Sequence, residues 1–281
     1  MRIAITGHKG QLGQCLQRRL ADHELLLIDL PEYDITQVHS IVPAIQDFKP
    51  DVVIHTAAYT DVDGCERDPD TAFRVNALGT QNVAVACQKA GAELVHISTN
   101  EVFDGRKGVP YLEYEHRNPI NTYGRTKYAA ERYVELLLQR FYIVRIAWLF
   151  APGGNNFVSK ICALARQRGR LAIVTDEISS PTYGPHLADA LARLIQTSHY
   201  GIYHLTNEGL CSRYEFAAYF LPLAGLGHVQ LDRITSEQYK RASTPPLYTP
   251  LRNFAAATLL GITLPSWQEA VHDYFVAIGK P

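Results

Sequence analysis

The chain has 281 residues, of which 47% are hydrophobic and 20% charged, and this composition excludes a disordered or collagen-like polymer. Its 27 basic and 28 acidic side chains leave a formal net charge of -1. No global field therefore attracts nucleic acid or an anionic membrane, and we expect a globular protein whose partner is a small molecule.

Short apolar runs rich in Val and Ile alternate with longer segments of helical periodicity from residue 2 to residue 205. This alternation predicts an α/β fold, with a doubly wound parallel sheet covered by helices on both faces. The expected strands are residues 3–6, 25–29, 52–56, 94–98 and 143–147, with a return to the sheet near 202–205. Asp68, Pro69 and Gly91 delimit one helix of about 20 residues, because they fit an N-cap, a first-turn proline and a C-terminal glycine.

A glycine-rich loop follows the first expected strand directly. Gly7, Gly10 and Gly13 form a G-x-x-G-x-x-G pattern, and a helix is expected over residues 14–20. Such glycines let the backbone approach a pyrophosphate, which the N-terminus of the helix attracts. A turn that only packs helix against strand is the structural alternative. In its context, the loop favours a Rossmann-type dinucleotide-binding domain over residues 1–150.

The composition changes after Phe150. Residues 151–156 have the composition of a loop, and prolines interrupt the alternation further on, at positions 181, 185, 245, 246 and 250. We therefore expect a smaller, mixed C-terminal part over residues 151–281 that mainly binds the substrate. A segment near 185–205 is expected to return to the first part.

The second expected strand ends at Asp29, where a carboxylate would meet the adenosine ribose of a dinucleotide. Asp29 favours NAD, because a carboxylate repels a 2′-phosphate, whereas His8 and Lys9 in the glycine loop could attract one. The sequence therefore leaves NADH and NADPH both open. Lys9 is equally well interpreted as a solvated surface lysine.

Tyr123 and Lys127 lie one turn apart on the same face of an expected helix. An ammonium beside a phenol lowers the phenol's pKa from about 10, so the tyrosine can give a proton to a carbonyl oxygen as hydride reaches the carbon. The lysine can also hold the nicotinamide ribose. Thr99 ends the fourth expected strand, so its hydroxyl is expected to face the same crevice. These residues predict an NAD(P)H-dependent reductase.

Other short motifs accompany these residues over nearly the whole chain: Ala57-Ala58-Tyr59-Thr60-x-Val62-Asp63, Val102-Phe103-Asp104-Gly105, Arg145 with Trp148, Pro181-Thr182 and Leu264-Pro265-x-Trp267. Together with the glycine loop and the Tyr/Lys pair, they resemble the extended short-chain dehydrogenase/reductases and, more narrowly, the dTDP-4-dehydrorhamnose reductase family. The resemblance implies reduction of the 4-keto group of dTDP-4-dehydro-L-rhamnose to dTDP-L-rhamnose with NADPH or NADH. A homodimer is compatible with it.

The resemblance also implies a role for each matching position. Tyr123 would donate the proton, Lys127 would assist it and bind the ribose, and Thr99 would hydrogen-bond the sugar carbonyl. The cofactor would contact Gly7, Gly10, Gln11, Leu12, Gly13, Asp29, Asp34, Ile35, Ala57, Ala58, Tyr59 and Lys127. The sugar would contact Thr99, Asn100, Tyr123 and Trp148, although Trp148 considered without the resemblance is a core aromatic.

One departure from the family lies beside the chemistry. The usual Ser-Thr-Asp-Tyr-Val-Phe is replaced here by a segment that carries Asn100 and Glu101. Asn100 has no charge, and Glu101 puts a carboxylate in place of an aromatic ring. We expect Glu101 to face solvent rather than to act as a catalytic acid.

Two other functions stay open. The departure at Asn100 and Glu101 favours a reductase of another nucleotide-linked 4-keto sugar. The fold also resembles the β-subunit of methionine adenosyltransferase, a non-catalytic NADP-binding regulatory subunit. The intact set of Thr99, Tyr123 and Lys127 argues against that second alternative.

The sequence gives no sign of several other features. The five cysteines are scattered without a Cys-x-x-Cys pair, which predicts reduced thiols. None of the 11 histidines has a compact ligand spacing, so no metal site is expected. No signal peptide pattern or membrane-spanning apolar run is found, which predicts a cytoplasmic protein. The arginines at positions 140, 145, 166, 168 and 170 are expected on helix ends or solvated faces.

Overall fold

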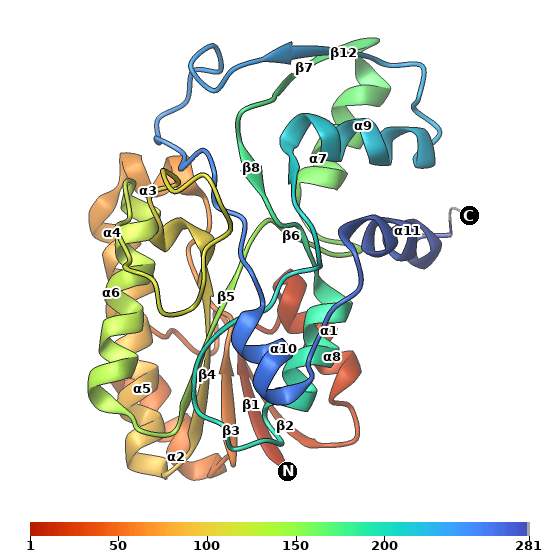
Figure 1. Ribbon diagram of the computed structural model, residues 1–281. Coiled ribbons are helices and arrows are strands. Elements are labelled where there is room, and N and C mark those ends of the chain that lie inside the picture. The colour runs from red at the N-terminus through yellow and green to blue at the C-terminus, as the bar shows by residue number, and fades with distance from the viewer. Residues whose placement is uncertain (280–281) are drawn as a thin grey trace.

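A parallel sheet of six strands forms the centre of the computed structural model, which describes residues 1–279 (Figure 1). Its strands are β1 (Arg2–Thr6), β2 (Glu24–Ile28), β3 (Val52–His55), β4 (Glu93–Thr99), β5 (Phe141–Ile146) and β10 (Gly201–His204). They lie in the order β10-β5-β4-β3-β1-β2, and every neighbouring pair is parallel. The predicted α/β sheet is confirmed, with small shifts at the strand ends.

Both faces of the sheet are buried, because successive side chains along a strand point to opposite sides. Ile3 and Ile5 of β1 belong to one hydrophobic cluster, whereas Ala4 between them belongs to another. The first cluster includes residues of α1 (Gln11–Arg19), α8 (Gly184–Leu194) and α10 (Phe254–Leu260). The second includes residues of α2 (Val38–Phe48), α5 (Gly79–Ala90) and α6 (Thr122–Leu137), on the left in Figure 1.

The helix predicted between Asp68 and Gly91 is present, but a π-helical turn interrupts it. Asp68 caps its start by accepting a hydrogen bond from the Thr71 amide at 3.1 Å, and Gly91 ends it in the left-handed conformation. The chain passes through α4 (Pro69–Phe73), the π turn η1 (Arg74–Leu78) and α5. The short helix α3 (Val62–Arg67) precedes it. The π turn was not predicted, since it leaves no signal in the apolar periodicity.

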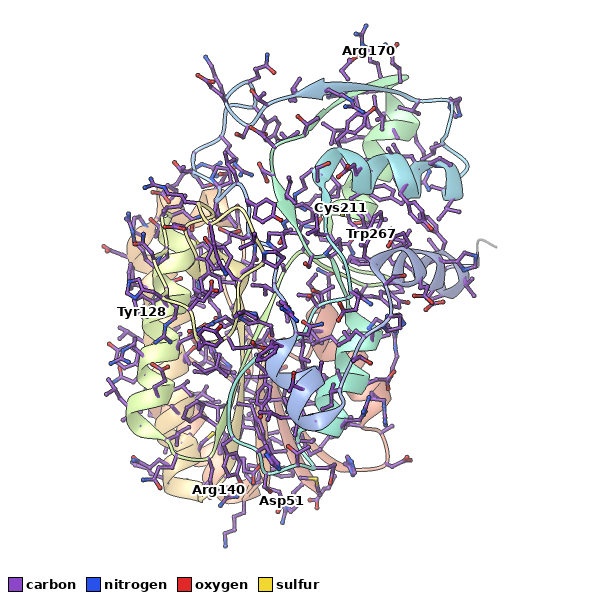
Figure 2. All side chains as sticks on the ribbon, viewed as in Figure 1. Asp51, Tyr128, Arg140, Arg170, Cys211 and Trp267 are labelled. Atoms are coloured by element: carbon purple, nitrogen blue, oxygen red, sulfur yellow. The ribbon has the colours of Figure 1, made fainter. Side chains whose placement is uncertain are left out.

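The chain after Phe150 builds a third hydrophobic cluster beside the sheet. Its helices are α7 (Phe157–Gln167), α9 (Arg213–Leu223) and α11 (Trp267–Ala277), and Figure 2 shows Trp267 among them. The strands β7 (Arg170–Val174) and β12 (Gln230–Ile234) pair in parallel at the top of Figure 1. Shorter pairs are β6 (Leu149–Phe150) with β9 (Thr182–Tyr183), and β8 (Ile178–Ser179) with β11 (Cys211–Ser212). Residues 280–281 of the predicted C-terminal part lie outside the described residues.

The prediction of a solvated Arg145 is wrong. Arg145 lies on β5, its side chain is fully buried, and it forms a two-point ion pair with Glu131 of α6 at 2.8 and 2.9 Å. Arg117 binds the same carboxylate at 2.9 Å. The other arginines of that prediction are exposed, and Figure 2 shows Arg140 and Arg170 projecting from opposite ends of the molecule.

Among the helices of residues 1–279, none is both long and apolar enough to cross a lipid bilayer.

Candidate active site

A cavity of about 960 Å³ lies along the carboxyl ends of the sheet strands. It borders β1 and β3, between which the sheet reverses its winding direction, and α/β sheets bind ligands at such a point. Its lining extends from the glycine loop to Tyr123 and Trp148, and Arg213 of α9 contributes from the C-terminal part. Of the predicted cofactor and sugar contacts, all except Gly13 line this cavity.

The glycine loop is built for close packing at two of its three glycines. Gly7 has φ +71°, and a Cβ there would lie 2.6 Å from the Ala57 nitrogen. A Cβ on Gly13 would lie 2.3 Å from the Gly7 carbonyl oxygen, so Gly13 brings helix α1 against the loop instead of facing the cavity. Gly10 lines the cavity itself, directly before the first turn of α1. The loop therefore presents backbone and a helix N-terminus to the cavity, as a pyrophosphate site requires.

At the end of β2, the Asp29 carboxylate binds two backbone amides. It accepts hydrogen bonds from Lys9 and Leu30, each at 2.9 Å. The Lys9 ammonium in turn donates to the Leu30 carbonyl at 2.5 Å and lies 3.4 Å from Glu32. Asp29 and Lys9 thus form one wall of the cavity, so a carboxylate and an ammonium are both present where an adenosine ribose would lie.

Asn76, on the π turn, fixes the segment that follows β3. Its amide oxygen accepts from the Tyr59 nitrogen at 2.7 Å, and its amide nitrogen donates to the Tyr59 carbonyl at 3.0 Å. The same nitrogen donates to Thr126 of α6 at 3.0 Å. Asn76 therefore connects the cavity wall at residues 57–59 with the helix that carries Tyr123. Sequence reasoning missed it, because an isolated asparagine inside a helix gives no signal.

Tyr123 lies in the first turn of α6, beside the end of β4. Burial raises the pKa of Tyr123, the Glu101 charge raises it further, and a hydrogen bond between Tyr123 and Thr99 partly offsets both. The predicted lowering of this pKa by Lys127 is therefore absent. Its physical reason is burial, which disfavours the charged phenolate. The Lys127 ammonium donates to the Ile97 carbonyl at 2.7 Å and lies 3.4 Å from His96 Nε2. The phenol stays protonated, which is the form a proton donor needs.

The prediction that Glu101 faces solvent is wrong. Glu101 is half-buried in the short 3-10 helix η2 (Asn100–Val102), lines the cavity, and accepts a hydrogen bond from Asn121 at 2.6 Å. Burial raises the pKa of its carboxyl, whereas the Asn121 hydrogen bond and nearby arginines oppose that shift. The sequence did not predict the burial of Glu101, because its hydrogen-bond partner Asn121 lies further along the chain, at the start of α6.

Asn100 connects the end of β4 with the C-terminal part. Its amide nitrogen donates to Thr249 at 2.6 Å and to Ser179 at 3.3 Å, and its amide oxygen accepts from Thr99 at 3.2 Å. An uncharged amide suits this place, because it donates and accepts at once while fully buried.

Trp148 has a backbone φ of +45°, which is uncommon for a residue other than glycine. The Arg213 guanidinium lies 3.6 Å from the centre of its ring, and Glu177 is 3.7 Å from the same guanidinium. Burial lowers the pKa of Arg213 to about 10, although Glu177 opposes the shift. Arg213 lines the cavity but was missed in the sequence, where it is a lone arginine at a helix start.

A smaller cavity of about 80 Å³ lies beside the first, with which it shares Glu101, Trp148 and Arg213. Two carboxylates and two guanidiniums line it, those of Glu101, Glu177, Arg213 and Arg241. Glu177 pairs with Arg241 at 2.9 Å. Within residues 1–279, no group of three or more His, Cys, Asp or Glu side chains is placed to hold a metal ion.

The cavity fits a nicotinamide dinucleotide. At one end it offers the glycine loop and the N-terminus of α1. At the other end it offers the protonated phenol of Tyr123 with the Thr99 hydroxyl beside it. Its volume lies near the upper end of the usual range for ligand sites, about 300–1,000 Å³. Trp148, Glu101 and Arg213 also line this cavity.

Comparisons with known proteins agree with this geometry. The family model described as RmlD substrate binding domain matches residues 1–279. The spore coat polysaccharide biosynthesis protein SpsK of Bacillus subtilis is 36% identical over 275 residues, which cover 97% of this chain and 96% of that protein.

Two solved structures are similar over nearly the full length. The dTDP-4-dehydrorhamnose reductase of Clostridium acetobutylicum superposes with a TM-score of 0.96 at 37% identity and covers 99% of this chain and 100% of that one. The dTDP-4-dehydrorhamnose reductase of Bacillus anthracis, solved in complex with NADP, gives a TM-score of 0.95 at 38% identity, with 98% and 99% covered.

Proposed function

Because this chain belongs to the dTDP-4-dehydrorhamnose reductase family, we propose that it reduces the 4-keto group of dTDP-4-dehydro-L-rhamnose to give dTDP-L-rhamnose, with NADPH or NADH as the reductant. One observation carries the proposal. A single continuous cavity has the glycine loop and Asp29 at one end and Thr99, Tyr123 and Lys127 at the other.

The roles of the residues follow from their chemistry. The nicotinamide supplies the hydride when it is bound. Tyr123 gives its proton to the carbonyl oxygen, and the raised pKa of its phenol keeps that proton available until the oxygen becomes basic. Thr99 donates to the same oxygen, and Lys127 binds the ribose. Trp148 and Asn100 contact the sugar.

The dinucleotide site follows the cavity wall. Gly7, Gly10, Gln11 and Leu12 hold the pyrophosphate, Asp29, Asp34 and Ile35 contact the adenosine, and Ala57, Ala58 and Tyr59 follow the cofactor across the sheet. Gly13 acts only by packing α1 against the loop. Asp29 and Lys9 lie side by side, which supports the use of both NADH and NADPH.

The two parts of the chain divide this work. Residues 1–150, with the return segment near 185–205, bind the dinucleotide, and residues 151–281 mainly bind the sugar nucleotide. The position of Arg213 at the cavity supports the second assignment. All five cysteines are buried, and none of them forms a disulfide within residues 1–279, which supports a reducing, cytoplasmic location. A homodimer stays a prediction.

One alternative has an observation of its own. Glu101 and the pair of arginines beside it give the sugar end a charged wall, which favours a reductase of another nucleotide-linked 4-keto sugar. A regulatory subunit without activity is not favoured, since Thr99, Tyr123 and Lys127 share one cavity and the similar solved structures are reductases.

The test offers the purified chain dTDP-, GDP- and UDP-linked 4-keto sugars and measures cofactor oxidation. We expect the dTDP sugar to be turned over fastest. Replacing Tyr123 by Phe should lower kcat by about 10²–10⁴-fold, because it removes the general acid. Tyr128→Phe is the matched control, since Tyr128 is a half-buried tyrosine of the same helix outside the cavity (Figure 2).

Preference for a GDP or UDP sugar would favour the alternative substrate. An undiminished Tyr123→Phe enzyme would rule out the proposed proton donor.

A further inference from the structure

Two buried histidines lie side by side beneath Lys127, and the proposed mechanism uses neither. His55 is on β3 and His96 on the neighbouring β4, with ring centres 5.4 Å apart and planes 28° from parallel. Both ring nitrogens of His55 have partners, Thr6 at 2.6 Å and Thr80 at 3.0 Å. His55 is therefore fully hydrogen-bonded within the core.

His96 differs from His55 in both of its nitrogens. Its Nε2 lies 3.4 Å from the Lys127 ammonium nitrogen, whereas its Nδ1 is buried and has no hydrogen-bond partner among residues 1–279. Buried polar atoms without a partner are rare, because they lose water without gaining a bond. The packing around His96 therefore leaves its Nδ1 without a hydrogen bond.

The Lys127 ammonium is buried without a carboxylate of its own. Its strong hydrogen bond goes to the Ile97 carbonyl at 2.7 Å, and no ion pair to it is found within the described residues. Glu131 lies one turn along the same helix, but both of its oxygens are engaged by Arg145, and Ser98 and Arg117 bind them too. The charge on Lys127 is thus held at close range only by a carbonyl and an imidazole.

The chemistry of this pair fixes which nitrogen of His96 carries the proton. An ammonium has donors only, so the Nε2 that faces it must be the acceptor, and the ring proton must then sit on the unpartnered Nδ1. Burial and the charge of Lys127 hold the pKa of His96 well below its ordinary value, so the ring is neutral. A neutral acceptor is what the ammonium requires.

We propose that His96 is a positioning residue for Lys127, whose ammonium it holds together with the Ile97 carbonyl so that the remaining N–H faces the cavity. This inference rests on the proposed function, because there Lys127 acts on the bound ribose. It adds His96, which neither the motifs nor the cavity lining include.

The titration of Lys127 reports on this contact. Burial lowers the pKa of Lys127 to about 8, and Glu131 opposes the shift. The other titratable groups that its charge acts on are His96 and His55 of the sheet, and Tyr123 lies one turn earlier on α6. Without the acceptor at His96, the charged form loses a hydrogen bond, so the pKa of Lys127 should fall further.

The experiment follows the ¹³Cε chemical shift of Lys127 against pH in the protein without cofactor, with the signal assigned by its loss in Lys127→Arg. In His96→Leu the midpoint should move down by about one pH unit, a tenfold change in the proton affinity. His96→Gln should restore it, because the amide oxygen can accept at the place of Nε2. His55→Leu is the matched control, and its Lys127 midpoint should stay at the parent value.

The enzyme gives the second readout. The alkaline limb of kcat/KM should move in the same direction in His96→Leu, so that activity is lost more at alkaline than at neutral pH. If His96→Leu does not fold, His96→Met removes the acceptor with a more adaptable side chain. An unchanged Lys127 midpoint in the folded apolar variant, or an equal shift in His55→Leu, would overturn the proposal. Because the titration needs no sugar or cofactor, failure of the proposed reaction would not imitate that result.

Discussion

The Glu101 carboxylate lies against the first turn of α6, hydrogen-bonded to Asn121, and raises the pKa of Tyr123 through its charge. A negative charge disfavours the phenolate that remains after proton donation. Glu101 therefore lowers the acid strength of Tyr123, the proposed proton donor, and also lines the cavity beside it.

Replacing Glu101 by Gln removes the charge and keeps the size of the side chain. We expect the pKa of Tyr123 to fall, because the phenolate no longer faces a carboxylate. The ¹³Cζ shift of Tyr123 against pH measures it. Glu66→Gln is the control, since Glu66 binds the Thr122 amide at the same helix end without lining the cavity. A Tyr123 titration unchanged in Glu101→Gln would contradict this electrostatic role.

Residues predicted correctly to line the cavity belong to local patterns. Tyr123 and Lys127 are one turn apart, and Thr99 ends a strand, so their common edge follows from helix and sheet geometry. The contacts of Arg213 with Trp148 and of His96 with Lys127 could not be predicted, since each joins segments that lie far apart in the sequence. Periodicity gives no information on such pairs.

Among the elements, the glycine loop combines a turn with a close approach. Gly7 needs a positive φ and also lies against the Ala57 backbone, whereas Gly91, at the end of α5, needs only the positive φ. A comparison of the two positions therefore separates the effect of a positive φ from the effect of a steric clash.

Gly7→Ala should abolish cofactor binding and lower the free energy of unfolding by more than about 2 kcal/mol, because its Cβ would clash with backbone that cannot move away. Gly91→Ala should cost about 1 kcal/mol, since nothing lies within 4 Å of its Cβ. Denaturant unfolding and calorimetric titration with NADP measure both quantities. Equal losses in the two variants would show that the close approach at Gly7 is unimportant.

The π turn η1 illustrates what sequence periodicity cannot predict. The helix was predicted from Asp68 to Gly91, and both ends are confirmed. Asn76 lies on this inserted turn and binds Tyr59 and Thr126. Apolar spacing defines the buried face of a helix but not where a single extra residue is accommodated.

At the scale of the whole molecule, polar contacts join the sheet to the C-terminal part around the cavity. In Figure 1 the chain after β12 passes from the top of the molecule toward α3. There Ser243 donates to Asp63 twice, at 2.6 and 2.9 Å. Asn100 binds Thr249 further along the same segment. The sequence indicated an irregular, proline-rich stretch here but not its partners, which only the assembled fold brings together.

The buried cluster of Glu131, Arg145 and Arg117 is the main polar element of the core beside β5. Arg145→Leu should lower the free energy of unfolding by about 3–5 kcal/mol, since it leaves the Glu131 carboxylate buried with one fewer partner. The control is Arg140, an exposed arginine that pairs with the half-buried Glu93, and Arg140→Ala should cost about 0–1 kcal/mol. Urea unfolding measures both, and a loss in Arg145→Leu no larger than in the control would contradict the account.

The same cluster sets an acid limit on stability. The Arg145 guanidinium and hydrogen bonds lower the pKa of Glu131 from 4.5 to about 2, against the effect of burial. A lowered pKa stabilises the fold above pH 4.5, and this contribution is lost as the pH falls from 4.5 toward 2. Glu131→Gln should therefore show a weaker loss of stability across this interval than the parent. A parallel pH dependence in both proteins would exclude Glu131 as the group responsible.

The central claim, reduction at C4 of a dTDP-linked sugar, is tested most directly with NADPH that carries deuterium at the reactive position of the nicotinamide. The account predicts that dTDP-4-dehydro-L-rhamnose is converted to dTDP-L-rhamnose with deuterium at C4, seen by NMR, and that Tyr123→Phe forms this product at least about a hundred times more slowly. Product without deuterium at C4, or no conversion while the cofactor binds, would contradict it.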